Sequence, residues 1–384
     1  MRSLMPEKSA IETNWPALLV VALAYLSVTI GESILSPLFP VVSDRLSIPL
    51  GLAGVAFGVL TGATALGNLM GGRVAARTGT KGAAGLGIAL CGAGAVLAAA
   101  ASSGQILIGS QALIGLGSGV FFPNGLAAVR VLSAPSRRGL ILGLYGIAFS
   151  VGLAIASGVV ALLAADRWRG SFLVCAAIAA LALIALPRLH LPEVAVPPPE
   201  VSTPRPAFGS ATLVAAVAAI AQFGVVALLP TFAVQVWGWT EVAAASLLFV
   251  GRVVSIPAKA AAGAAVDRFG AITTAKILAS GLILSGLGWI LTTNSSLGAG
   301  LAVAFATLVG GVFPVANAIA VEEFGQNVGM LGTYRATQMG VAAVAVGFMG
   351  SGVSTVGFRP VLAAGVLTAL AVFLLNTRRM ASTS

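Results

Sequence analysis

The stretch Glu241–Gly270, EVAAASLLFVGRVVSIPAKAAAGAAVDRFG, is apolar enough to cross a lipid bilayer, yet it carries Arg252 and Lys259 inside the apolar run. A cation in such a segment costs about 2.5–3.5 kcal/mol on insertion scales, and proteins keep one where it faces a cavity, a partner or a substrate. The two cations are seven residues apart, so they share one face of the predicted helix. For the closing residues, GAAVDRFG (Gly263–Gly270), we expect a compact charged turn.

The composition of the whole chain is that of a membrane protein. Of its 384 residues 58% are hydrophobic and 8% are charged, against about 25% charged residues in soluble domains. The mean hydropathy is +1.03. We therefore expect an all-α membrane protein with many spans. The formal charge of +10 does not indicate nucleic acid, because the basic residues fall in loops, as membrane topology requires.

Apolar runs of spanning length form two sets of six on either side of a polar, proline-rich stretch. They lie near residues 16–41, 50–72, 82–101, 105–129, 138–164, 170–187, 209–234, 242–265, 271–292, 297–321, 328–352 and 356–376. The residues between the sets, with three consecutive prolines at 197–199, are typical of a linker. The predicted parts are an N-terminal six-helix bundle (1–187), a cytoplasmic linker (188–208) and a C-terminal six-helix bundle (209–384).

The distribution of basic residues predicts the orientation in the membrane. If the termini, the linker and the loops from even to odd spans are cytoplasmic, 14 of the 21 Lys and Arg residues lie inside, 4 lie outside and 3 lie within spans. Cytoplasmic loops carry the excess of Lys and Arg. We therefore expect a multi-pass protein of the cell (inner) membrane with both termini in the cytoplasm.

The two sets of spans repeat one another. The stretch Gly72–Gly79, GRVAARTG, lies 191 residues before Gly263–Gly270, and GVFFP at 119–123 lies 191 residues before GGVFP at 310–314. Two separate landmarks at one offset indicate parallel six-span halves. Such halves, related by an axis along the membrane normal, occur in transporters whose substrate site lies between them.

These loops carry a family resemblance: over nearly its whole length the chain resembles the major facilitator superfamily. The family pattern G-x-x-x-D-R-x-G-R-[RK] is matched by Asp267, Arg268 and Gly270. The first-half copy departs from it, because Ala76 replaces the acid and Thr80 replaces a base. The resemblance implies twelve spans in two pseudo-symmetric bundles, and the departures imply a weaker cytoplasmic charge latch in the first half.

Two subfamily features point in different directions. Drug/proton antiporters carry an Arg in span four, where this chain has Gln111, and a Gly-Pro in span five that is missing from GIAFSVGLAIASG. Monocarboxylate and nitrate porters carry a span-eight cation eight residues before the loop acid, which here is Lys259. The matching span-two cation of nitrate porters falls at Asn68. The stretch Gly115–Gly139 also looks like organic-anion porters.

Four charged residues within or near spans have open alternatives. Lys259 either binds an anion or extends to the cytoplasmic interface, and Arg252 pairs either with a carboxylate substrate or with Glu32. Glu32, the lone acid deep in a first-half span, is either a proton carrier or a static ion-pair partner. Arg335 either faces the cavity or joins Glu322 in a cytoplasmic gate.

Together these features predict a proton-coupled secondary transporter of a small organic solute, leaning to organic anions, that works by alternating access. The alternative is a drug/proton antiporter that exports amphiphilic compounds, and a third hypothesis is a transporter-like receptor without flux. The predicted substrate-binding residues are Arg252, Lys259, Tyr25, Asn68, Gln222 and Tyr334, the proton-coupling residue is Glu32, and the gating residues are Arg77, Asp267, Arg268, Arg335 and Glu322.

The same sequence predicts no enzyme. A single histidine, His190, leaves no nucleophile–histidine–acid set, and no phosphate-binding loop with Lys-Ser/Thr indicates ATP drive. Cys91 and Cys175 each lie within an apolar run and are expected to be small buried hydrophobes. We expect no cofactor, no metal and no nucleic-acid partner. The expected partners are a small-molecule substrate, protons and the lipid bilayer, around a monomer.

Overall fold

The structure, a computed structural model, describes residues 13–49, 51–134, 138–163, 167–189, 210–324 and 328–381. Its elements are α1 (Trp15–Arg45), α2 (Gly51–Ala99), α3 (Gly104–Leu132), α4 (Arg138–Leu163), α5 (Trp168–Ala185), the 3-10 turn η3 (Leu186–Arg188), α6 (Ser210–Ala219), the π-helix η4 (Ile220–Val226), α7 (Ala227–Trp237), α8 (Glu241–Phe269), α9 (Ala271–Leu291), α10 (Ser295–Phe324), α11 (Val328–Val356) and α12 (Phe358–Ala381).

These elements make the twelve spans of the predicted all-α membrane fold. Within the described residues ten stretches are long and apolar enough to cross a bilayer, and Phe358–Ala369 is a shorter apolar helix. One of the ten, α2, is two spans joined at a kink, and α6, η4 and α7 together form one span. Large apolar side chains such as Leu162, Leu284 and Phe348 are exposed, as expected where lipid takes the place of water.

Capping residues explain where several helices begin. The side chain of Asn14 accepts a hydrogen bond from the backbone amide of Ala17 at 3.1 Å at the start of α1. Thr240 does the same for Ala243 at 3.2 Å at the start of α8. Each cap satisfies one of the amides that a helix leaves without an internal partner.

The charged loops differ from the sequence prediction. The expected compact turn over Gly263–Gly270 is wrong: α8 stays helical through Phe269, and only Gly270 leaves the helix, with φ 80° and ψ 156°. Gly79 has nearly the same conformation, φ 73° and ψ 163°, at the kink inside α2. Both values lie in a region that favours glycine. The two glycines are 191 residues apart, so the internal repeat extends to the backbone angles.

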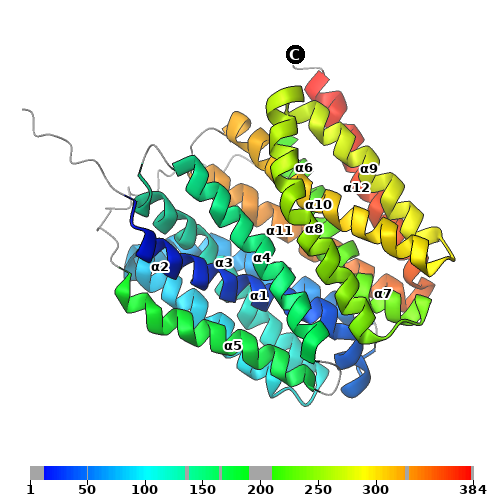
Figure 1. Cartoon of the computed structure of the whole chain (residues 1–384), viewed down its shortest axis with the longest axis horizontal. Coiled ribbons are helices and arrows are strands. Elements are labelled where there is room, and N and C mark those ends of the chain that lie inside the picture. The colour runs from blue at the N-terminus through cyan, green and yellow to red at the C-terminus, as the bar shows by residue number, and fades with distance from the viewer. Residues whose placement is uncertain are drawn as a thin grey trace, which may run out of the picture.

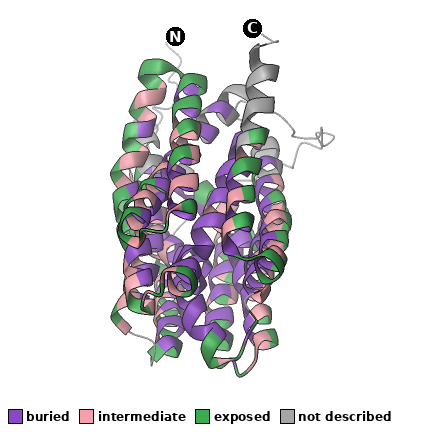
Figure 2. Ribbon diagram, turned by 90° about the vertical axis from the view of Figure 1, so that its right-hand side faces the viewer, coloured by how far each residue is buried: buried purple, intermediate pink, exposed green. Residues whose placement is uncertain are grey.

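The helices gather in two groups, α1–α5 and α6–α12 (Figure 1). Buried residues concentrate where the two groups meet, and exposed residues lie on the outer faces (Figure 2). Most of the predicted linker at 188–208 lies outside the described residues, so the boundaries of the two halves stay a prediction.

Several helix pairs join the groups in the described part of the chain, and three of them carry the contacts that follow. In the first, the Ser36 hydroxyl of α1 donates to the carbonyl of Ala227 in α7 at 2.9 Å. These residues are themselves 191 apart, so equivalent positions of the repeat meet at the interface. In the second, α2 and α11 touch backbone to backbone at Gly54 and Gly350. The third pair, α4 and α8, carries the charged contacts described below.

Candidate functional site

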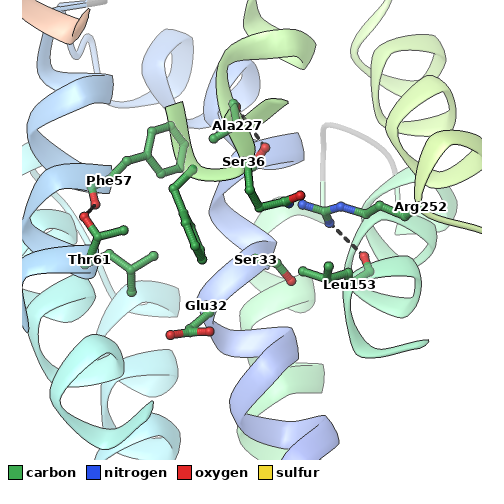
Figure 3. A pocket seen from close by; sticks show the side chains of 11 residues that line it. Glu32, Ser33, Ser36, Phe57, Thr61, Leu153, Ala227 and Arg252 are labelled. Atoms are coloured by element: carbon green, nitrogen blue, oxygen red, sulfur yellow. Dashed lines mark hydrogen bonds between the residues drawn. The ribbon is translucent and has the colours of Figure 1, made fainter. Parts of the chain in front are cut away.

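A small cavity lies between the two groups of helices (Figure 3). The space open to a water-sized sphere is about 20 Å³, room for about one water molecule. Its lining comes from α1, α2, α4, η4, α7 and α8, and consists of Glu32, Ser33, Ser36, Phe57, Leu60, Thr61, Leu153, Gln222, Phe223, Ala227 and Arg252. The predicted proton carrier and one predicted substrate cation therefore share one cavity.

The π-helix η4 supplies one wall of this cavity. Gln222 and Phe223 lie within its seven residues, Ile220–Val226, and both line the cavity. A π-helix is rare, and single-turn π segments occur frequently at functional sites because they redirect side chains within an otherwise regular helix. The predicted site residue Gln222 is thus placed in the cavity by a local irregularity that the sequence pattern did not indicate.

Hydroxyl groups of the N-terminal half hold the Glu32 carboxylate. The Thr64 hydroxyl, from α2, donates to Oε1 of Glu32 at 3.2 Å, and the side chain of Ser118, from α3, also hydrogen-bonds to the carboxyl group. Glu32 is buried. Its carboxyl group points away from the Arg252 guanidinium (Figure 3), so the structure does not contain the alternative static ion pair with Arg252.

Among the described residues, the hydrogen-bond acceptors of the Arg252 guanidinium are neutral groups of α4. Its Nη1 donates to the carbonyl oxygen of Leu153 at 2.7 Å and to the hydroxyl oxygen of Ser157 at 2.6 Å. The residue is 5% exposed, and its buried Nε has no hydrogen-bond partner in the described part of the chain. A guanidinium presents five N–H donors, so this one keeps capacity for an acceptor in the cavity.

Lys259 reaches the same partner helix two turns farther along α8. Its Nζ donates to the hydroxyl oxygen of Ser150 and lies 5.2 Å from the ring centre of Phe149. Two serines of α4, seven residues apart, thus match two cations of α8, also seven residues apart. The α4–α8 contact holds two positive charges without an ion-pair partner among the described residues.

Arg335 lies near the same centre. Its side chain is exposed, and its charge lies within electrostatic range of Glu32, Tyr25, Tyr145 and Lys259. Arg335 does not line the cavity, and the side chain of Glu322 lies outside the described residues, so both predicted roles of Arg335 stay predictions. In the described part of the chain, three cations from the C-terminal half and one acid from the N-terminal half thus lie around the interface.

The other predicted site residues divide into two groups. Tyr25 is buried in an aromatic cluster beside the interface, Tyr334 is buried in the core, and Asn68 is half-buried on α2. The predicted gating residues Arg77, Asp267 and Arg268 are exposed near the two glycine kinks. Glu322 lies in α10, and its side chain falls outside the described part of the structure.

Sequence reasoning missed the partners of the charged residues. Ser150 and Ser157 bind the two cations, Thr64 binds Glu32, and Tyr145 and Phe149 lie beside the cations. One available indication was the seven-residue spacing of the two serines, which equals that of Arg252 and Lys259. Serine is too common in membrane helices for this spacing to be decisive without the fold.

Comparison with known proteins identifies the family. Residues 21–355 match the family description Major Facilitator Superfamily. The chain belongs to this superfamily. It is therefore a multi-pass membrane protein of a transporter family and not an enzyme.

The proteins that this chain is similar to differ in the function that their names state. It is 31% identical over 189 residues to the methylenomycin A resistance protein of Bacillus subtilis (strain 168), a match that covers 48% of this chain and 40% of that relative. The xylose transporter XylE from E. coli superposes with a TM-score of 0.76 at 14% identity, covering 97% of this chain and 98% of that one. A human organic anion transporter superposes with a TM-score of 0.66 at 18% identity, covering 94% and 99%. At these identities the structural likeness establishes the fold alone.

Proposed function

We propose that this transporter carries a small organic anion across the membrane in a proton-coupled, alternating-access cycle. The observation that carries the proposal is that the two cations of α8 have no anionic partner among the described residues. Arg252 and Lys259 lie at the interface between the halves, and the hydrogen-bond acceptors that hold them are neutral. Desolvating a charge costs several kcal/mol, and a charge-assisted bond to a carboxylate is roughly twice as strong as a neutral one. An anionic substrate is the partner that this arrangement lacks.

The balance of charge around the interface supports an anion. Arg252, Lys259 and Arg335 supply three positive charges near the centre, and Glu32 supplies one negative charge. A cationic solute would meet a net repulsion there, whereas an anion would be drawn in. The buried free Nε of Arg252 gives one donor to which a carboxylate oxygen could bind.

Glu32 is suited to carry the coupling proton. Its hydrogen-bond partners are hydroxyl groups, which can donate to the ionised carboxylate and accept from the protonated acid. A bonded cation would hold the ionised form instead. Because Glu32 and Arg252 line one cavity without pairing, proton binding and substrate binding can influence one another there.

Transport by this arrangement requires the halves to separate. The cavity between the halves is about 20 Å³, room for about one water molecule, and does not admit an organic solute. The contacts between the halves at Gly54–Gly350 and Ser36–Ala227 are among those that must break to open the cavity toward the side where α2 begins. The moving bundles are then residues 1–187 and 209–384, joined by the linker 188–208 on the cytoplasmic side of the inner membrane. In this topology the side where α2 begins is the outer one.

A drug/proton antiporter exporting amphiphilic compounds is the second candidate. One observation favours it: the relative from Bacillus subtilis is named for resistance to methylenomycin A. A resistance protein of this superfamily would export the compound to which it gives resistance. If that compound carried a negative charge, its export would agree with both candidates.

Affinity for a panel of anionic, neutral and cationic ligands, measured on the purified protein and two variants, tests the proposal. Arg252→Ala and Lys259→Ala should each weaken anion binding by well over about 1 kcal/mol, because a buried charge would lose its partner. Lys276→Ala, at an exposed cation of α9, is the matched control and should bind as the wild type does. Tight binding of cations that neither variant alters would refute the anion proposal and favour the antiporter.

A further inference from the structure

An aromatic cluster of the N-terminal half lies directly beside the cations of the C-terminal half. Helices α1, α3 and α4 contribute its five rings: Tyr25, Phe121, Phe122, Tyr145 and Phe149. Tyr25 stacks on Tyr145 with ring centres 4.0 Å apart and planes 9° apart. Phe122 meets Tyr25 edge-on at 5.4 Å. The remaining rings lie within 6.5 Å of a neighbour.

Three of these rings are only partly enclosed. Phe122, Tyr145 and Phe149 are half-buried, whereas Phe121 and Tyr25 form the buried back of the cluster. The hydroxyl oxygen of Tyr145 is buried without a hydrogen-bond partner among the described residues. A buried hydroxyl without a partner is unfavourable. The cluster is therefore not a completed core: three of its rings keep exposed surface, and one buried hydroxyl lacks a partner among the described residues.

Lys259 lies over one ring of the cluster, and Arg335 lies within electrostatic range of two others. Lys259 Nζ lies 5.2 Å from the ring centre of Phe149, and Arg335 lies within electrostatic range of Tyr25 and Tyr145. The cation position over Phe149 is thus taken by a residue of the protein. A cationic ligand that sought the ring face would be repelled by Lys259 and Arg335, and an anion would be attracted by both.

We propose that the half-buried rings and the two cations form one subsite, and that the transported anion is a carboxylate on an aromatic ring. The ring packs against Phe122, Tyr145 and Phe149, and the carboxylate is bound by Lys259 and Arg335. This inference rests on the proposed anion transport and adds the class of anion. Aromatic pairs prefer offset or edge-on contacts and gain free energy beyond the area they bury.

Binding of three carboxylates to the purified full-length protein tests the inference: benzoate, cyclohexanecarboxylate and acetate. Benzoate and cyclohexanecarboxylate have similar size and charge, so their difference reports the ring contact. A single aromatic contact corresponds to a preference of up to about tenfold. We expect benzoate to bind about tenfold more tightly than cyclohexanecarboxylate, and acetate to bind most weakly.

Two variants remove one ring each and keep the site apolar. Phe149→Leu and Tyr145→Leu should each reduce the preference for benzoate severalfold while leaving the affinity for cyclohexanecarboxylate within about twofold. Phe348→Leu, which removes an exposed ring of α11, is the control and should keep the preference. Because the two variants are independent, a folding defect in one leaves the other as the test.

The outcomes separate this inference from the proposed function. Equal affinity for benzoate and cyclohexanecarboxylate, unchanged in both ring variants, would overturn the aromatic subsite and leave anion transport standing. Tighter binding of benzylammonium than of benzoate would overturn both. Absence of binding for all three carboxylates would refute the proposed organic-anion transport and, with it, the subsite.

Discussion

The backbone contact between α2 and α11 offers a direct way to shift the conformational equilibrium. Gly54 and Gly350 meet where α2 begins and α11 ends. A Cβ added to Gly350 would lie 2.8 Å from the carbonyl oxygen of Gly51 and would also meet the backbone of Gly54, whereas ordinary contact begins at 3.4 Å. The neighbouring atoms are backbone and cannot rotate away, so Gly350→Ala should push the two helices apart.

The size of the effect follows from the geometry. Overpacking a close contact costs about 1–3 kcal/mol, which corresponds to about a 5- to 150-fold change in an equilibrium constant. The conformation seen here should lose that much population relative to one in which α2 and α11 separate. Gly347→Ala is the matched control, because nothing lies within 4 Å of a Cβ at Gly347. Both changes raise helix propensity equally, so their difference isolates the steric term.

A disulfide reporter measures this shift. A Cβ on Gly51 would lie 3.1 Å from the Cβ of Ser354. This is slightly closer than the roughly 3.5–4.5 Å usual in a disulfide, so Gly51→Cys with Ser354→Cys should cross-link under mild oxidation after a small outward shift of the helices. The native Cys91 and Cys175 are buried and should contribute little background. Adding Gly350→Ala should slow cross-linking, by an amount that approaches the change in the equilibrium constant once the separated conformation predominates, while Gly347→Ala should not change it. Equal rates for the two variants, both folded, would refute the steric reasoning.

Two further predictions follow from the placement of charge. Glu32→Gln should abolish uphill transport driven by a proton gradient and leave substrate exchange. The amide keeps hydrogen bonds to Thr64 and Ser118 but cannot carry a proton. Normal proton-driven accumulation by this variant in proteoliposomes would exclude Glu32 from coupling. Reporter fusions at Thr203 and Ser384 should both report the cytoplasm, because the predicted topology places 14 basic residues on that side and 4 on the other, as cytoplasmic loops require. A periplasmic result at either position would contradict the orientation.

The sequence alone determined the class, the spans and the repeat. Hydropathy is a property of each segment and adds up along it, so the twelve runs could be predicted without knowing how the helices pack. The offset of 191 residues was visible in GRVAARTG and GAAVDRFG, and it recurs in the φ and ψ angles of Gly79 and Gly270. Local sequence did not decide where α8 ends, because Asp267 and Arg268 are compatible with both a turn and an exposed last helical turn.

Only the tertiary structure decided which groups meet. The apolar pattern predicted that Arg252 and Lys259 share a helix face, but their partners, Ser157 and Ser150, lie 95 and 109 residues away in the chain. The rotation and translation of one helix against another depend on the packing of whole bundles. The same packing separates Glu32 from Arg252 within one cavity and brings an aromatic cluster to the cations, and these relations between distant segments are absent from any single stretch of sequence.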